Sequence, residues 1–274
     1  MQDTVIIIFD IFMVTFVASS MITTGLGLSV SQIIEPFKNV KLVILSVIAN
    51  FIIVPLFAFV IIWLIPVSEG ARIGILLLSF CGGAPFIPKL VMLAKGPLGS
   101  AVGLMLLLLM MTMLIMPIVV PLVFQGASIS SWELAQSLLF SMLIPLMVAL
   151  LTRAYFEKFA LKIQPLFNQL TNLSVLVLIG AVLYLYTDTI LAAARTLPVI
   201  LLFFVGSMAI GYLTGGDKRN ARIVLSIGTG LRNPPIAILV ASQYFSSEPM
   251  AAIVPLLTVI IGLAILIPLA IKIR

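Results

Sequence analysis

Histidine is absent from the 274-residue chain, and Cys81 is its only cysteine. An internal disulfide, a thiolate metal site and histidine-based acid–base or nucleophilic catalysis are therefore excluded. Charged residues make up only 9% of the chain, whereas hydrophobic residues make up 62%. A mean hydropathy of +1.32 is more than a water-soluble domain can expose without aggregating. The composition predicts an all-α polytopic membrane protein, and we expect no enzymatic activity, no cofactor and no metal.

Long apolar runs, separated by charged or Pro/Gly-rich joints, predict nine membrane-spanning helices. The predicted spans lie near residues 4–30, 41–65, 71–95, 98–124, 132–152, 169–187, 196–214, 220–245 and 249–271. The stretch from residue 153 to 168 alternates basic and apolar residues. It is expected to be an interfacial connector between the halves on the cytoplasmic face, with a lipid-sensing role as the less favoured alternative.

The basic residues are distributed unevenly between the two sides that nine spans define. The side of the carboxyl terminus holds Lys38, Lys41, Lys95, Arg153, Lys158, Lys162, Lys218, Arg219, Arg222, Lys272 and Arg274. Because cytoplasmic loops are enriched in Lys and Arg, the carboxyl terminus is predicted to be cytoplasmic and the amino terminus to lie outside the cell (inner) membrane. The net charge of +6 is attributed to these loops at the lipid bilayer, and nucleic acid is not an expected partner.

Two of the predicted spans contain helix-breaking sequences. Gly228–Pro235, GTGLRNPP, lies deep inside an apolar run, and its two prolines predict a break near Arg232–Asn233. Cys81–Lys89, CGGAPFIPK, interrupts the third span in a similar way. Lys89 and Arg232 are the two basic residues that fall inside spans. A cation at bilayer depth favours a functional role, with an arginine that snorkels to the interface as the alternative.

The two broken spans run in opposite directions, one in each half of the chain. Such a pair is typical of transporters built from inverted repeats with a binding site near the middle of the membrane. We therefore predict a first repeat over residues 1–126, with four helices of which the third is broken. The second repeat is predicted over residues 127–274, with five helices of which the fourth is broken.

Three motifs, in order along nearly the whole chain, resemble the bile acid:sodium symporter family. They are GLGLS at Gly25–Ser29, CGG…LAKG at 81–96 and GTGLRNP at 228–234. The resemblance implies ten helices in two inverted five-helix repeats, arranged as a panel domain and a core domain whose broken helices cross. This chain is similar to the nine-helix form of a bacterial homologue, which lacks the first helix.

The chain departs from the family pattern where sodium would bind. The resemblance implies an acidic residue at the position of Gly228 and a glutamine at the position of Arg232. The Ser-Asn pair of the first motif falls on Ile87 and Pro88, with Lys89 next, and the polar positions of the following helix fall near Ala101 and Met105. The positions that would bind Na⁺ therefore offer few side-chain oxygens, and they carry two positively charged residues, Lys89 and Arg232.

Two compatible hypotheses account for Lys89 and Arg232. In the first, these cations and Gly228 replace the sodium site, with the Arg232 guanidinium at the carbonyl end of a half-helix. In the second, Lys89 and Arg232 bind an anionic substrate together with Asn233 and the prolines of the breaks, Pro85 and Pro234. Asp10 is a candidate ion-pair partner for Lys89 or a proton carrier; alternatively, it faces water near the outer end of its span.

The sequence thus predicts a secondary transporter of an organic anion, which is either bile-acid-like or a small carboxylate or sulfate. Alternating access without sodium is the expected mechanism, by facilitated diffusion, exchange or proton coupling. The first alternative is sodium-coupled symport of an organic anion. A second alternative, of another class, is a receptor that does not transport or a channel-like protein on the same scaffold. Substrate identity and oligomeric state are not predicted.

Overall fold

The computed structural model describes residues 2–29, 40–125, 129–185 and 196–273, and the described part is helical with no strand. Its elements are α1 (Gln2–Gly27), α3 (Val40–Ile48), the π-helix η2 (Ala49–Ile53), α4 (Val54–Leu64), α5 (Glu69–Phe80), α6 (Ile87–Leu93), α7 (Leu98–Val123), α8 (Ser131–Leu138), the π-helix η3 (Leu139–Leu143), α9 (Ile144–Tyr155), α10 (Glu157–Leu185), α12 (Leu197–Thr214), α13 (Arg219–Gly230), α14 (Pro234–Tyr244) and α15 (Met250–Ile273). The predicted boundary between repeats, at residues 126 and 127, lies outside the described residues.

Eight helical segments of the described chain are long and apolar enough to cross a membrane. One of them, Arg219–Tyr244, includes the predicted break. The remaining predicted span, 71–95, forms α5 and α6, which have 12 and 7 residues and are each shorter than the roughly 20 residues that cross a bilayer. The chain is therefore a polytopic helical membrane protein, and the count of nine spans stays a prediction.

The stretch 153–168, predicted to be an interfacial connector, is helical almost throughout, and its place at the membrane surface stays a prediction. Helix α9 runs to Tyr155, and α10 begins at Glu157 and continues for 29 residues. Most of its large apolar side chains are exposed, among them Tyr155, Phe156, Phe159 and Leu166, whereas Ala160 is buried in a small cluster with Leu26 and Ala149. The stretch packs on α1 and α9 with part of its surface and exposes its lysines together with most of its large apolar side chains, as an interfacial segment would.

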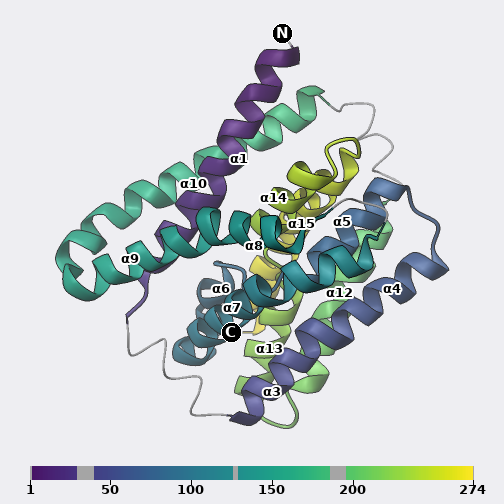
Figure 1. Cartoon of the computed structure of the whole chain (residues 1–274). Coiled ribbons are helices and arrows are strands. Elements are labelled where there is room, and N and C mark those ends of the chain that lie inside the picture. Colours follow the sequence, from purple (N-terminus) through teal and green to yellow (C-terminus); the bar gives the residue numbers. More distant parts are fainter. Residues whose placement is uncertain (1, 30–39, 126–128, 186–195, 274) are drawn as a thin grey trace.

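Helices α1, α9 and α10 form a group that packs chiefly within itself. Figure 1 shows α1 and α10 side by side along one edge of the molecule, with α9 next to them. Helices α3–α7 and α12–α15 gather around the two broken segments. We call the first group the panel and the second the core; this division agrees with the family fold that the motifs imply.

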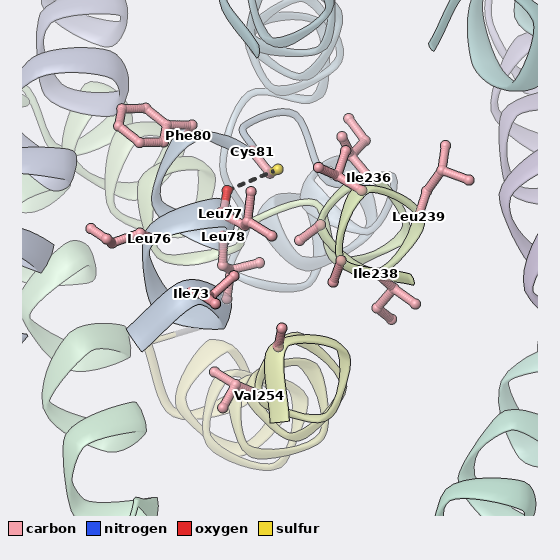
Figure 2. Packing of buried hydrophobic residues seen from close by; sticks show 14 of the residues in the cluster. Ile73, Leu76, Leu77, Leu78, Phe80, Cys81, Ile236, Ile238, Leu239 and Val254 are labelled. Carbon is pink, nitrogen blue, oxygen red and sulfur yellow. Dashed lines mark hydrogen bonds between the residues drawn. The ribbon is translucent and has the colours of Figure 1, made fainter. Parts of the chain in front are cut away.

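The interior of the core is built by α5, α14 and α15. Figure 2 shows α5 beside α14, with Leu77 and Leu78 of α5 between the two helices and Val254 of α15 beneath them. Helices α5 and α15 approach closely because Gly74 has no side chain: a Cβ there would lie 2.9 Å from the Ala251 carbonyl oxygen. This packing fixes where the two broken segments meet.

The breaks lie where proline and glycine predict them, and they contact each other. Helix α5 ends at Phe80, and α13 ends at Gly230, four residues before Pro234. Across the crossing, the Asn233 backbone N–H donates to the Cys81 carbonyl oxygen at 2.8 Å, and Asn233 Nδ2 donates to the Gly83 carbonyl oxygen at 3.1 Å. The predicted crossing of two broken helices is therefore confirmed.

Helix α7 supports the first break through Thr112. Its buried hydroxyl accepts a hydrogen bond from the Gly82 N–H at 2.9 Å and donates to the Leu108 carbonyl oxygen at 2.8 Å. Gly83 takes a φ of +82°, and a Cβ there would lie 2.4 Å from the Leu109 nitrogen. Glycine is required at this turn, and threonine replaces the helical partner that the Gly82 N–H has lost.

Replacing Thr112 by valine is expected to destabilise the protein by about 1–3 kcal/mol, because a buried N–H loses its acceptor while the side-chain volume is kept. Thermal unfolding of the purified protein measures this. The matched control is Thr152→Val on α9, whose partly exposed hydroxyl bonds only the Val148 carbonyl of its own helix. Equal melting temperatures for the two variants would contradict the supporting role of Thr112.

Candidate functional site: the crossing of the broken helices

Arg232 lies at the centre of the crossing and is 2% exposed. Its guanidinium donates from Nε to the Leu78 carbonyl at 3.2 Å, and from one terminal nitrogen to Asn50 Oδ1 at 2.5 Å and to the Thr229 carbonyl at 3.4 Å. The other terminal nitrogen donates to the Asn50 carbonyl at 3.2 Å and to the Ser79 carbonyl. All five N–H donors of the guanidinium are used, so none is left for a solute in this conformation.

The carbonyls of α5 accept from Arg232 because their helix stops beneath them. In a continuous helix, the Leu78 carbonyl would bond the N–H of Gly82, four residues on. That N–H is instead bonded to the hydroxyl of Thr112. The Leu78 and Ser79 carbonyls belong to the last turn of α5, where the helix dipole carries partial negative charge.

The Asn50 carbonyl is freed by a proline in the second span. Within η2 the hydrogen bonds run back five residues, and the Val54 N–H donates to the Ala49 carbonyl. The donor for the Asn50 carbonyl would then be Pro55, which has no N–H. The π-helix thus exposes one carbonyl toward the crossing, a local irregularity of the kind often found at functional sites.

The Thr229 carbonyl belongs to the end of α13. Its helical donor would be the N–H of Asn233, which instead donates to the Cys81 carbonyl on the other broken segment. The Thr229 hydroxyl accepts from Asn50 Nδ2 at 3.1 Å, and the same Nδ2 donates to the Ser46 carbonyl at 2.9 Å. Asn50 therefore joins the second span to the end of α13 and holds the guanidinium between them.

No carboxylate neutralises Arg232 within the described chain. The ion pairs there join Arg72 to Glu69, Arg153 to Glu157 and Arg222 to Asp217. Arg232 is surrounded by four backbone carbonyls and one amide oxygen, contributed by α5, η2 and α13. Oxygen dipoles around a single positive charge form the environment that proteins use for hard cations, and here the cation is covalently part of the chain.

Lys89 is not brought to Arg232. It is exposed on α6 and lines a pocket of about 310 Å³ between the panel and the core. The panel side of this pocket is rich in hydroxyl and amide groups, supplied by Ser20, Thr23, Thr24, Gln164, Asn168 and Thr171. The pocket presents one cation among neutral hydrogen-bonding groups, a combination suited to a small anion.

Pro85 lines this pocket and also a second one of about 330 Å³, together with Pro234. The walls of the second pocket are mostly apolar, including Phe16 of α1 and Val175 of α10, and Arg232 also lines it. Ser20, Pro85 and Phe86 line both pockets, so the two adjoin. The polar and the apolar pocket both lie at the interface between the panel and the core.

The remaining predicted site residues are Asp10, which lines neither pocket, and Gly228 and Asn233, which are buried. Asp10 is exposed on α1 and forms no ion pair with Lys89; it is ten residues, or roughly 15 Å along the helix, from the nearest α1 residue of the polar pocket, Ser20. Gly228 is buried, and a Cβ there would lie 2.4 Å from Leu104 of α7. Asn233 is fully buried, and its Oδ1 has no hydrogen-bond partner.

The family profile described as the Sodium Bile acid symporter family matches residues 14–193. The chain belongs to this family. The match includes the first broken segment and ends before the second. Family membership confirms the resemblance that the three motifs suggested, and it supports a membrane transporter rather than an enzyme.

Two relatives are similar over most of the chain. A rice (Oryza sativa subsp. japonica) protein named "Probable sodium/metabolite cotransporter BASS2, chloroplastic" is 25% identical over 91% of this chain, which spans 63% of the rice protein. A Bacillus subtilis (strain 168) protein named "Uncharacterized sodium-dependent transporter YocS" is 22% identical over 88% of this chain and 76% of its own length. Both names state a sodium-dependent activity for those proteins.

Proposed function

We propose that this family member is a secondary transporter that moves an organic anion by alternating access and needs no sodium for its cycle. The observation that carries the proposal is the guanidinium of Arg232, whose five N–H groups bond oxygens of α5, η2 and α13. A bound Na⁺ would need such oxygens and would neutralise the same helix ends. A fixed cation stabilises the crossing continuously, so the stability of this region no longer depends on an ion from solution.

In this proposal Arg232 replaces the cation, and Lys89 binds the substrate. Lys89 is exposed in the polar pocket and has no ion-pair partner among the described residues, so its charge is available to an anion. The adjoining apolar pocket, with Pro85 and Pro234 in its wall, suits the hydrocarbon part of an amphipathic carboxylate or sulfate. Movement of the panel against the core would then expose this line of contact to each side of the membrane in turn.

The proposed orientation follows the basic residues, with the amino terminus outside and the carboxyl terminus in the cytoplasm of the cell membrane. Asp10 remains the proposed proton carrier if transport is coupled to protons, because it is the carboxylate that lies within a predicted span. The proposed halves, residues 1–126 and 127–274, each contain one broken helix, as inverted repeats require.

The second candidate function is sodium-coupled symport. The unpaired Oδ1 of Asn233 favours it, because a buried amide oxygen without a donor is a candidate cation ligand. The names of the two relatives point the same way. The two candidates differ in one measurable property, the dependence of flux on sodium.

Counterflow in proteoliposomes tests the proposal. Vesicles preloaded with each member of an anion panel (taurocholate, small carboxylates and sulfate) are diluted into tracer of the same anion, in Na⁺, K⁺ or choline buffer of equal ionic strength. We expect accumulation of at least one anion, at equal rates in the three buffers. Accumulation that occurs only in Na⁺ would favour the symport alternative. Flux far above carrier rates, or binding without flux, would favour a channel or a receptor.

A further inference from the structure

A groove of about 800 Å³ lies between α12, α13 and α15, away from the pockets that adjoin the panel. Its walls are mostly apolar, with Val205 and Ala209 on α12 and Leu266 and Leu269 on α15, and Ile223 and Ile227 of α13 form the floor. The volume falls within the range of ligand-binding cavities, about 300–1,000 Å³. The groove shares no lining residue with either pocket of the proposed transport site.

The shape of the groove follows from where its helices touch. A Cβ at Gly262 would lie 2.8 Å from the ring of Phe204, so α15 and α12 are in contact there. Both helices then continue toward their carboxyl ends, and the groove opens between them over residues 265–270 and 205–213. Val205 and Leu213 are 48% and 76% exposed, so this wall faces the surroundings of the protein, which at this depth are lipid.

The groove ends in a basic rim. The basic residues that line the groove or lie within two positions of a lining residue are Lys95, Lys218, Arg219, Arg222 and Lys272; the acidic residue by the same criterion is Asp217. The side chain of Asp217 is fully exposed and lies 3.8 Å from the Arg222 guanidinium, farther than a hydrogen bond. The rim therefore keeps an excess of positive charge.

Arg222 is held at the mouth of the groove. Its Nε donates to the Gly216 carbonyl at 2.5 Å, one terminal nitrogen donates to the Tyr212 hydroxyl at 3.2 Å, and the guanidinium stacks over the Tyr212 ring at 4.9 Å. Its side chain is still 36% exposed. Helix α13 begins at the same place, Arg219, without a side-chain cap, and its dipole adds to the attraction for an anion.

We propose that this groove binds an anionic phospholipid, with one acyl chain along α12 and α15 and the phosphate at Arg219 and Arg222. The apolar walls match a hydrocarbon chain, and the basic rim at a helix end matches a headgroup phosphate. Basic pockets between transmembrane helices recognise anionic headgroups in this way. A soluble phosphate would leave the apolar walls uncovered, and a neutral lipid would leave the rim charge unmatched.

Native mass spectrometry of the detergent-solubilised full chain tests this proposal, with phosphatidylglycerol and phosphatidylcholine of identical acyl chains as probes. At equal lipid concentrations we expect phosphatidylglycerol to be retained preferentially. Because a basic residue near the membrane surface contributes about fivefold to the attraction of an anionic lipid, Arg219→Gln/Arg222→Gln should lower this preference roughly 20- to 30-fold. The matched control is Lys158→Gln/Lys162→Gln, which removes two exposed charges from α10.

A second pair of variants tests the apolar part without changing charge. Ala209 is exposed and lines the groove, so Ala209→Trp should fill it and reduce retention of phosphatidylglycerol; Ala154→Trp, at an exposed position of α9, is the control. Glycerol 3-phosphate, which has no acyl chain, should not compete. Equal retention of the two lipids, competition by glycerol 3-phosphate, or a protein dimer that replaces bound lipid would each overturn the proposal. None of these outcomes bears on anion counterflow, so the transport proposal is tested separately.

Discussion

Replacing Arg232 by methionine is expected to destabilise the protein by about 3–5 kcal/mol, because each buried oxygen that loses its donor costs about 1–3 kcal/mol and removal of the buried charge offsets part of the sum. Methionine keeps much of the side-chain volume but removes the donor of four buried oxygens at the ends of α5, η2 and α13; the Leu78 carbonyl keeps the Cys81 N–H. Thermal or denaturant unfolding in detergent measures the change. The control is Arg72→Met, because Arg72 is 55% exposed and pairs with Glu69 at 3.8 Å; its loss should cost less than about 1 kcal/mol.

A second variant separates the role of the charge from that of the side-chain packing. Arg232→Ala vacates the cluster of carbonyls, and we expect the melting temperature of this variant to rise with Na⁺ concentration more than with choline. Such a rise would mean that a free cation binds the oxygens that the guanidinium bonds in the unmodified protein.

The methionine variant gives the outcome that would contradict the account. If Arg232→Met is as stable as Arg72→Met, Arg232 is not a structural cation.

Replacing Lys89 by glutamine is expected to lower the rate of anion counterflow about 10- to 100-fold while the melting temperature stays within about 1 °C. A hydrogen bond to a charged group contributes about 1.5–3 kcal/mol, which corresponds to this range of rates. Stability should be kept because Lys89 is exposed in its pocket and makes no ion pair in the described chain. Initial rates in proteoliposomes give the comparison.

The matched control for Lys89 is Lys158→Gln, which removes an exposed charge from α10 outside the two pockets. Lys89→Arg should restore part of the rate, since it keeps the charge at this position. Unchanged counterflow in Lys89→Gln would contradict the proposed substrate site. It would leave the account of Arg232 intact, because the two residues line different pockets.

The helix breaks could be predicted from sequence because they depend on local chemistry. Pro234 and Pro235 remove two donors from one segment, and Gly83 takes a positive φ that other residues rarely adopt. Arg232 at the second break could also be singled out from the sequence, since an arginine between apolar segments stands out in a hydropathy analysis; its role stays a prediction. These features need no knowledge of the partner helices.

The partners of Arg232 could not be predicted, because they come from tertiary packing. Asn50 and Thr112 were missed, although each supplies contacts that fix the crossing. A signal for Asn50 did exist: it is an amide inside an apolar span, five residues before Pro55, where the proline leaves a carbonyl without a donor. This signal could be linked to Arg232 only with the knowledge that the second span packs against the crossing.

The sequence also grouped Lys89 with Arg232 because both are cations inside predicted spans. The structure places the Lys89 side chain in the pocket between panel and core and buries the Arg232 side chain inside the core. The direction in which each residue points depends on the rotation of its half-helix, and α6 is only seven residues long. A pattern of hydrophobicity over so few residues does not fix that rotation.

Thermal unfolding of the unmodified protein in Na⁺, K⁺ and choline at equal ionic strength tests the central claim most directly. A ligand that binds the folded state stabilises it by RT ln(1 + [L]/Kd), about 2.7 kcal/mol at a hundredfold excess over Kd. If the guanidinium of Arg232 occupies the place of the cation, the three melting temperatures should agree. A rise specific to Na⁺ would contradict the claim, and it would identify a sodium site that Arg232 has not replaced.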